Sequence, residues 1–378
     1  MTTLFWFSVA GIALAYAGYP AVLAVVGAVR RRPIAKGAIE PAVSILIAAH
    51  NEADDIEATI KNKLELDYPA GRREIIVVSD GSTDGTDDIV RRYESRGVRL
   101  LTQNPRRGKT AALNWAATVS TGEILVFSDA NSIYRPDALR RIVANFADPS
   151  VGYVTGKMLY ADASGSIIGS GCSAYMRYEN VLRELETRVG SVVGVDGGVD
   201  AVRRSLYEPM REDLLPDFIL PLRVAGKGRR VVYEPEAVLI EQTLTETSDE
   251  VRMRVRVILR SYHALWFMKR LLNPFRTGFF AFQLFAHKIL RYLVGVLQLT
   301  ALVSSAAVAG RSPFYAAVFA VQVVFYLFAL GGFLLRRGRA HGLFRYPYYL
   351  CLLNGAALMA LWKFLKGDNI AVWTPRKG

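Results

Sequence analysis

Cysteine and histidine are scarce in this chain. Its 378 residues include two cysteines, Cys172 and Cys351, which lie far apart, and four scattered histidines. A cysteine zinc site needs ligands at short spacings, and a disulfide framework needs several cysteine pairs. The sequence therefore excludes both kinds of scaffold, and its histidines do not have the spacing of metal ligands either.

Charge is missing from one long stretch near the start. No charged residue lies between Leu4 and Val29, a stretch longer than the roughly 20 residues that cross a bilayer. The basic run 30–32 follows directly. Because basic residues favour the cytoplasmic side of a span, we expect a retained anchor with its N-terminus outside and the following residues in the cytoplasm.

The overall charge is strongly basic, with a formal net charge of +13. Hydrophobic residues make up 52% of the chain and charged residues 21%, which excludes a disordered or fibrous protein. A lysine and arginine excess is also typical of nucleic-acid binders, but many of these residues flank apolar blocks. We therefore expect the lipid bilayer as their partner and no nucleic acid.

Three more apolar segments predict spans near the C-terminus: Leu293–Ala309, Phe314–Leu335 and Tyr348–Leu365. Lys363 and Lys366 conflict with a simple alternation, because a fourth crossing would leave them outside. One segment is therefore expected to be re-entrant or interfacial. The expected division is an anchor at 1–30, a cytoplasmic α/β domain at 40–245, an amphipathic interfacial segment at 246–276, about three transmembrane helices at 277–367 and a tail at 368–378.

Between the spans, β-rich runs alternate with helical patterns. The strand candidates are Ala42–Ala48, Glu74–Ser79, Arg99–Leu101 and Glu123–Ser128, and the helix candidates are Asp54–Leu66, Thr86–Arg96, Thr110–Ser120 and Pro136–Phe146. This alternation predicts an α/β domain with a mainly parallel sheet. Ligands of such sheets bind at the carboxyl ends of the strands, so we expect the chemistry in those loops.

Acidic residues follow three of the predicted strands. Glu52 follows VSILIAAH, Asp80 follows EIIVVS, and Asp129 follows EILVFS, while a fourth acid, Asp217, lies in LPDF. Any one of them alone would be an ordinary turn or helix-cap residue. Three at one edge of one sheet indicate a site.

The ordered set of motifs resembles the family-2 glycosyltransferases over about residues 40–270. The segments that carry the resemblance are VSILIAAHNEADDI, VVSDGSTDGT, GKTAALN, FSDAN and PDFILPLRVAGKGRRVVYEPEA. The flanking spans are similar to the membrane-bound branch, the group of cellulose, chitin, hyaluronan and poly-N-acetylglucosamine synthases. The resemblance implies a Rossmann-like nucleotide-diphospho-sugar transferase fold of the GT-A type, and transfer with inversion.

The resemblance also implies a donor site. Asp129 is its metal ligand, with Asn131 secondary because many relatives have a second acid there. Mg²⁺ or Mn²⁺ is the expected cofactor, since both ions prefer oxygen ligands and can neutralise a diphosphate. Glu52 and Asp80 are expected to hold the nucleotide. Lys109 is either a residue near the base or diphosphate or a solvated lysine of a basic run.

Two further roles come from the same resemblance. Asp217 lies where the family places its general base, with Asp213 and Glu212 as alternatives nearby. The segment Met253-Arg254-Val255-Arg256-Val257 takes the place of the family's Q-x-x-R-W motif, so that only its arginine is kept. Arg256 is the residue that we expect at the donor diphosphate.

The expected function is inverting transfer from a nucleotide-sugar donor, a UDP-sugar, to a membrane-associated acceptor. A growing cell-surface polysaccharide is the first choice of acceptor, and a single sugar added to a lipid is the alternative. A catalytically inactive relative that serves as a scaffold or sensor is a second alternative. The expected location is the inner (plasma) membrane, multi-pass, with the catalytic domain cytoplasmic; an oligomer or an export partner is left open.

Overall fold

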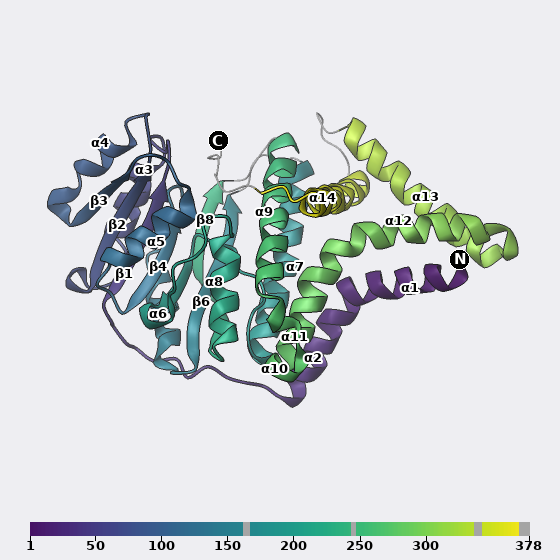
Figure 1. Ribbon diagram of the computed structural model, residues 1–378, viewed down its shortest axis with the longest axis horizontal. Helices are drawn as coiled ribbons and strands as arrows, with labels where there is room; N and C mark the ends of the chain where they lie inside the picture. Colours follow the sequence, from purple (N-terminus) through teal and green to yellow (C-terminus); the bar gives the residue numbers. More distant parts are fainter. Residues whose placement is uncertain (162–166, 243–246, 336–341, 370–378) are drawn as a thin grey trace.

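The computed structural model describes residues 1–161, 167–242, 247–335 and 342–369. Its centre is an eight-stranded sheet with the strand order β3-β2-β1-β4-β7-β6-β8-β5 (Figure 1). The strands are β1 (Val43–Ala49), β2 (Arg73–Asp80), β3 (Val98–Gln103), β4 (Ile124–Asp129), β5 (Ile133–Tyr134), β6 (Val151–Ala161), β7 (Asp200–Arg203) and β8 (Arg230–Gln242). The α/β expectation is confirmed.

The first four strands pair in parallel, whereas the other half of the sheet is mixed. β1 lies between β2 and β4, and β2 pairs with β3, all in parallel. β7 is antiparallel to both of its neighbours, β4 and β6. The parallel half therefore brings the carboxyl ends of β1, β2 and β4 to one edge.

Both faces of the sheet are covered by helices, which explains why β1 is a continuous apolar run. Ile45 and Ile47 pack into the core on one face, and Leu46 and Ala48 into the core on the other. The first core includes residues of α3 (Ile56–Leu64), α4 (Thr86–Arg91) and α6 (Ala138–Ala144). The second includes residues of α5 (Lys109–Val119), α8 (Pro216–Gly226) and α9 (Thr247–Phe267).

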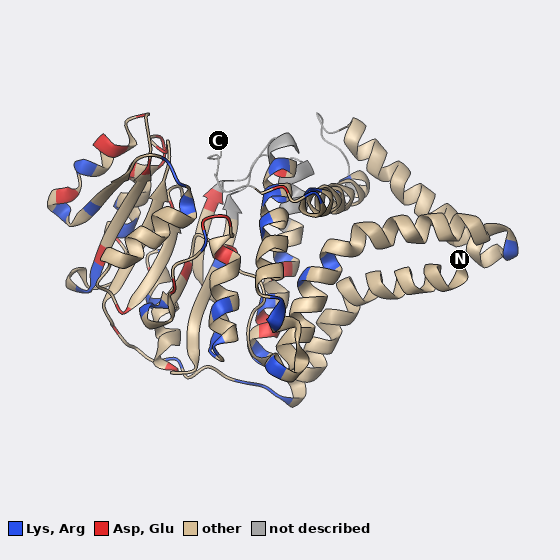
Figure 2. Ribbon diagram, viewed as in Figure 1, with Lys and Arg blue, Asp and Glu red and all other residues tan. Residues whose placement is uncertain are grey.

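Within the part of the chain that the structure describes, four apolar helical segments are long enough to cross a membrane, by length and composition: Thr2–Val29, Phe279–Arg311, Pro313–Leu334 and Leu343–Leu365. They contain α1 (Thr2–Ala13), α2 (Tyr19–Val29), α11 (Phe279–Leu284), α12 (Arg291–Val308), α13 (Pro313–Leu334) and α14 (Gly342–Leu365). Figure 2 shows that α1, α12 and α13 carry almost no charge, whereas charged residues are spread over the sheet and its helices.

The last helix packs against α9, α12 and α13 but points in a different direction from α12 and α13. α14 is seen end-on in Figure 1, while α1, α12 and α13 extend away from the sheet across the view. The chain after α14 returns to the α/β domain, where the Asp368 carbonyl lies 2.9 Å from His263 Nε2 and Asn369 Nδ2 donates to Asp213 Oδ2 at 3.2 Å. This return brings residues 368 and 369 to the domain's side of the molecule.

Buried charges join the apolar helices to α7 (Ile167–Val189). Glu186 of α7 accepts a hydrogen bond from the Tyr19 hydroxyl and lies 2.6 Å from His287 Nδ1. Glu179, two turns earlier, pairs with Arg291 at 2.5 Å. Because these carboxylates are buried and paired, α7 is held to both the first and the second apolar segment.

Candidate functional site

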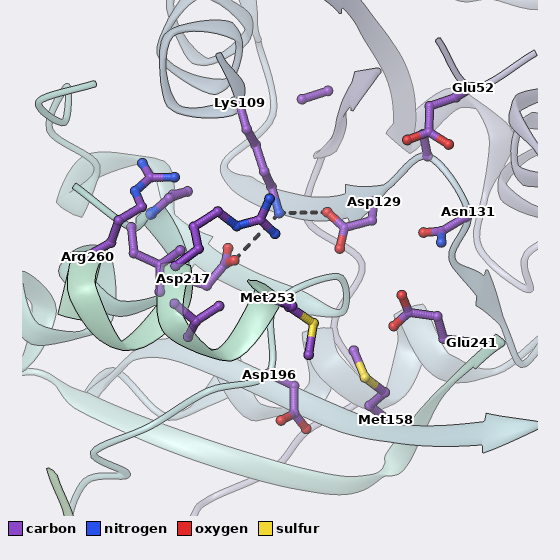
Figure 3. A pocket seen from close by; sticks show the side chains of 16 residues that line it. Glu52, Lys109, Asp129, Asn131, Met158, Asp196, Asp217, Glu241, Met253 and Arg260 are labelled. Carbon is purple, nitrogen blue, oxygen red and sulfur yellow. Dashed lines mark hydrogen bonds and ion pairs between the residues drawn. The ribbon is translucent and has the colours of Figure 1, made fainter. Parts of the chain in front are cut away.

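A pocket opens at the carboxyl edge of the parallel strands (Figure 3). The sequence-predicted residues that line it are Glu52, Lys109, Asp129, Asn131, Asp217 and Arg256. They come from the ends of β1 and β4, from the N-termini of α5 and α8, and from α9. The fold thus brings together side chains that lie more than 200 residues apart in the chain.

Lys109 is the central charge of this pocket. Its Nζ lies 2.6 Å from Asp129 Oδ1 and 3.5 Å from Asp217 Oδ2, and Figure 3 shows it pointing between the two carboxylates. Burial alone would lower the pKa of Lys109, but the carboxylates of Asp129 and Asp217 outweigh it and raise that pKa. With its side chain 16% exposed, Lys109 is a pocket residue and not a solvated one.

Asp217 occupies the first turn of α8, just after Pro216. Burial raises its pKa, and the Lys109 ammonium opposes that rise. Gly197 must be a glycine here, because its φ is +77° and a Cβ would lie 2.8 Å from Asp217 Cγ. A partly buried carboxyl with a raised pKa is suited to take a proton from a substrate.

The alternative acids are engaged elsewhere. Asp213 pairs with Arg211 at 2.7 Å, and Glu212 pairs with Arg107. Neither is among the described residues that line the pocket. The geometry therefore favours Asp217 over both.

Asp80 is the sequence-predicted residue that does not line the described pocket. Its Oδ1 accepts from Gln103 Nε2 at 2.6 Å and from the Arg107 amide at 2.8 Å, and its Oδ2 accepts from the Gly108 amide at 2.8 Å. Gly108 has a φ of +94° and precedes α5. Asp80 thus holds the loop that delivers Lys109 to the pocket.

One face of α9 forms the opposite wall. Met253, Arg256, Val257 and Arg260 line the pocket at helical spacing. Arg260 also donates to the carbonyls of Leu214 and Glu212, at 2.5 and 3.1 Å, and burial lowers its pKa to about 10. It therefore supports the segment that leads into Asp217.

Sequence reasoning missed several of the lining residues, among them Arg260, Asp196 and Glu241. Arg260 follows Arg256 by one helical turn, which is the signal that would have paired them on one face. Asp196 forms a buried pair with Arg183 of α7. Asp196 and Glu241 belong to segments that the motifs above do not cover, so the sequence alone gave no reason to place them here.

Oxygen donors in the pocket fit a hard divalent cation. Asp129 and Asn131 both line it, and the Asp129 side chain is 34% exposed. Among the described residues, no group of three or more His, Cys, Asp and Glu side chains converges into a complete metal site. Mg²⁺ is usually held by one or two carboxylates together with substrate phosphates and water.

Comparison with known proteins identifies the domain. Residues 44–201 match the model of glycosyl transferase family 2. The chain carries a family-2 glycosyl transferase domain. The expected family and the GT-A type of fold are thereby confirmed.

The domain's relatives include two curated bacterial proteins. A probable glycosyltransferase, YdaM, from Bacillus subtilis (strain 168) is 30% identical over 217 residues, which are 53% of this chain and 51% of that protein. A poly-beta-1,6-N-acetyl-D-glucosamine synthase from Staphylococcus aureus (strain MSSA476) is 30% identical over 216 residues, again 53% and 51%. The chain spans about half the length of the curated relatives it matches.

A solved structure resembles nearly the whole chain. It is a mannosyltransferase from Pyrobaculum calidifontis in complex with GDP-Man and Mn²⁺, 25% identical, with a TM-score of 0.75. The match covers 97% of this chain and 99% of that one. The similarity therefore includes the helices outside the α/β domain.

Proposed function

We propose that this protein is an inverting glycosyltransferase that moves a sugar from a nucleotide-diphosphate donor to a membrane-held acceptor. The observation that carries the proposal is the constellation of Lys109, Asp129 and Asp217 in one pocket at the strand ends. The family of the domain supports it, as does the GDP-Man in the similar mannosyltransferase.

The residues have distinct roles in this proposal. Asp217 accepts the proton of the acceptor hydroxyl as the hydroxyl oxygen bonds to the anomeric carbon. The bond between that carbon and the diphosphate oxygen breaks from the opposite face, which inverts the configuration. Lys109 and Arg256 bind the diphosphate and stabilise its charge as it leaves.

Asp129 and Asn131 would hold the divalent cation, which supplies further charge neutralisation at the diphosphate when bound. Glu52 lines the pocket near them and is assigned to the nucleotide. Asp80 serves the same donor site indirectly, through the loop that it holds. The cation is Mn²⁺ or Mg²⁺, in line with the Mn²⁺ of the similar mannosyltransferase.

The acceptor has two candidates. The poly-beta-1,6-N-acetyl-D-glucosamine synthase among the relatives supports a growing polysaccharide. The apolar helices support a single transfer to a lipid, because their polar side chains pair with one another: Asn354 donates to Gln298, and Gln322 to Ser305, both at 2.9 Å. Such pairs hold helices together and leave those side chains less suited to line a path for a polymer.

The activity test is nucleotide release by the purified full chain in detergent, with GDP-mannose and UDP-N-acetylglucosamine as donors and Mn²⁺ present. The proposal expects release that depends on the cation and on Asp217. Sizing of the product made with membrane lipid extract separates the acceptors: one added sugar on extractable lipid contradicts the polymer. No release from either donor, with folded protein, contradicts the proposed activity for these donors.

The proposed topology places the α/β domain in the cytoplasm and has three crossings, with α14 at the interface. The basic run 30–32 and the return of residues 368 and 369 to the domain support it. A cysteine introduced at exposed Ser95 should resist impermeant thiol reagents in intact cells and react after lysis. Labelling in intact cells would show the opposite orientation and contradict this topology.

A further inference from the structure

Lys63 is completely buried although it carries an ammonium group. It lies on α3 and has no exposed surface. Its Nζ donates to the Ser132 carbonyl at 2.6 Å and to Asn62 Oδ1 at 3.0 Å, and lies 3.5 Å from the centre of the Tyr134 ring. Lysine is rarely buried unless its charge is satisfied, and here every side of the ammonium meets an acceptor or an aromatic face.

The acceptor belongs to the turn that follows β4, which carries the proposed cation ligands Asp129 and Asn131. Other side chains of α3 bind the same turn. Thr59 Oγ1 donates to the Ala130 carbonyl at 2.6 Å, Asn62 Nδ2 donates to the Tyr134 carbonyl at 2.8 Å, and the Tyr134 amide donates to Asn62 Oδ1 at 2.8 Å. One helix face therefore fixes the backbone of residues 130, 132 and 134.

Tyr134 extends this connection to the other side of the pocket. Its hydroxyl lies within hydrogen-bond distance of the carbonyls of Phe127, at 2.9 Å, and Gly198, at 2.5 Å. A Cβ at Gly198 would lie 3.4 Å from Asp129 Oδ2, and its neighbour Gly197 packs against Asp217. The ring above Lys63 thus links the turn of Asp129 to the glycine loop beside the proposed base.

If position 63 contributed only to the stability of the fold, an apolar residue would be sufficient there. The buried positions of α3 are Ile56, Thr59, Ile60 and Lys63, which is the helical spacing of a core-facing stripe. Burial lowers the pKa of Lys63, and the Asp129 carboxylate opposes that fall. The hydrogen bond to the Ser132 carbonyl directs the effect of this lysine to the turn at the donor site.

We propose that Lys63 is a positioning residue for the donor site: from beneath the turn, it sets the place of Asp129 and Asn131 relative to the Gly197–Gly198 loop. This inference rests on the proposed function, because it assumes that the turn holds a divalent cation and a nucleoside diphosphate. Lys63 itself touches neither, since the Ser132 carbonyl and the Tyr134 ring lie around its ammonium.

The test compares Lys63→Met with Lys61→Met in the full chain in detergent. Methionine keeps the length of the side chain and removes its donors and charge. Lys61 is the matched control, because it lies on the same helix, pairs with Glu57 and is 52% exposed. Mn²⁺ affinity is measured by electron paramagnetic resonance with GDP and, separately, UDP present, and steady-state nucleotide release gives kcat and the donor KM.

Lys63→Met should weaken Mn²⁺ binding about 10- to 100-fold, the range seen when partners behind a metal ligand are lost, and should raise the donor KM. Lys61→Met should match the wild type. Lys63→Gln, whose amide group can still donate to the Ser132 carbonyl, should fall between them, and it provides a second variant if Lys63→Met does not fold. Melting temperatures confirm that each measurement is made on folded protein.

Wild-type Mn²⁺ affinity and donor KM in folded Lys63→Met and Lys63→Gln would overturn the inference. So would a lowered melting temperature as the sole change, because this is the mark of a stabilising core residue. A wild-type protein that binds no Mn²⁺ with either nucleotide would instead count against the proposed function. The two failures are therefore distinguishable.

Discussion

Asp80 and Asp129 end the two strands on either side of β1, in the parallel half of the sheet, and yet they have different roles. Asp80 is the last residue of β2, and its side chain is 1% exposed. It accepts hydrogen bonds from two backbone amides of the loop before α5. Asp129 closes β4 with a side chain that is 34% exposed and faces the pocket beside Lys109. The end of a strand places an acidic side chain at the edge of the sheet. The packing of the surrounding loops then determines whether this side chain binds backbone amides or faces the pocket.

The largest effect is expected at Asp217, which shares Lys109 with Asp129. Asp217→Asn keeps the shape and removes the proton acceptor, so turnover should fall about 100-fold or more, the scale of lost general-base catalysis. Donor binding should stay nearly unchanged. Nucleotide release and Mn²⁺-dependent donor binding measure the two effects. Near-wild-type transfer by folded Asp217→Asn would remove Asp217 as the base and return attention to Asp213.

Asp129→Asn tests the pocket side of the comparison. The change removes the charge beside the proposed cation, so Mn²⁺ and donor affinity should fall together, by about 10- to 100-fold, while the melting temperature changes little. Titration with Mn²⁺ and GDP or UDP measures the affinity. If Mn²⁺ binding survived, Asp129 would not be the ligand that the motif predicts.

Asp80→Asn tests the buried side with the same chemical change. An amide in place of the carboxylate turns an NH₂ group toward amide donors, which leaves a buried polar group unsatisfied and costs about 1–3 kcal/mol of unfolding free energy. A lower melting temperature should accompany a weaker donor affinity, because the loop carries Lys109. An Asp80 variant as stable as Asp129→Asn, but weaker in nucleotide binding, would make Asp80 a direct ligand after all.

Asp80 and Asp129 also show how much of the site can be predicted from the sequence. Alternating runs predict the parallel strands, and so they predict that Glu52, Asp80 and Asp129 share one edge. They do not predict that Gln103 and the amides of Arg107 and Gly108 close over Asp80, because this contact joins the end of β2 to the loop after β3. Burial of this kind depends on packing that no local pattern records.

Lys63 illustrates the same limit. In the sequence, Lys61 and Lys63 look alike as two lysines of an amphipathic helix, and a solvated face is the ordinary interpretation of both. In the structure Lys61 is 52% exposed, whereas Lys63 has no exposed surface. The difference follows from helical geometry, since position 63 continues the buried stripe of Ile56 and Ile60. The stripe can be predicted from the sequence, but the hydrogen bond from Lys63 to the Ser132 carbonyl cannot.

The smallest expected effect concerns Asp200, which begins β7 and is completely buried. Burial raises its pKa from 3.8 to about 8. Between these two values the folded protein holds a proton that the unfolded chain has lost. Stability should therefore fall as the pH rises through this window and level off above about pH 8, with a slope of at most about 1.4 kcal/mol per pH unit.

Asp200→Asn removes this titration. It extends the comparison to an acid that, unlike Asp80, is not described as binding a loop's backbone amides and, unlike Asp129, is not among the residues that line the described pocket. Between pH 5 and 9, the melting temperature of the wild type in detergent should decline more steeply than that of Asp200→Asn, and the variant should be at least as stable at pH 8. Asp80→Asn should keep the wild-type slope, because it leaves Asp200 in place. Parallel pH profiles for the wild type and Asp200→Asn would mean that the Asp200 carboxyl is charged in the folded protein. Asp200 would then belong with Asp80, as a buried acid stabilised by the groups around it.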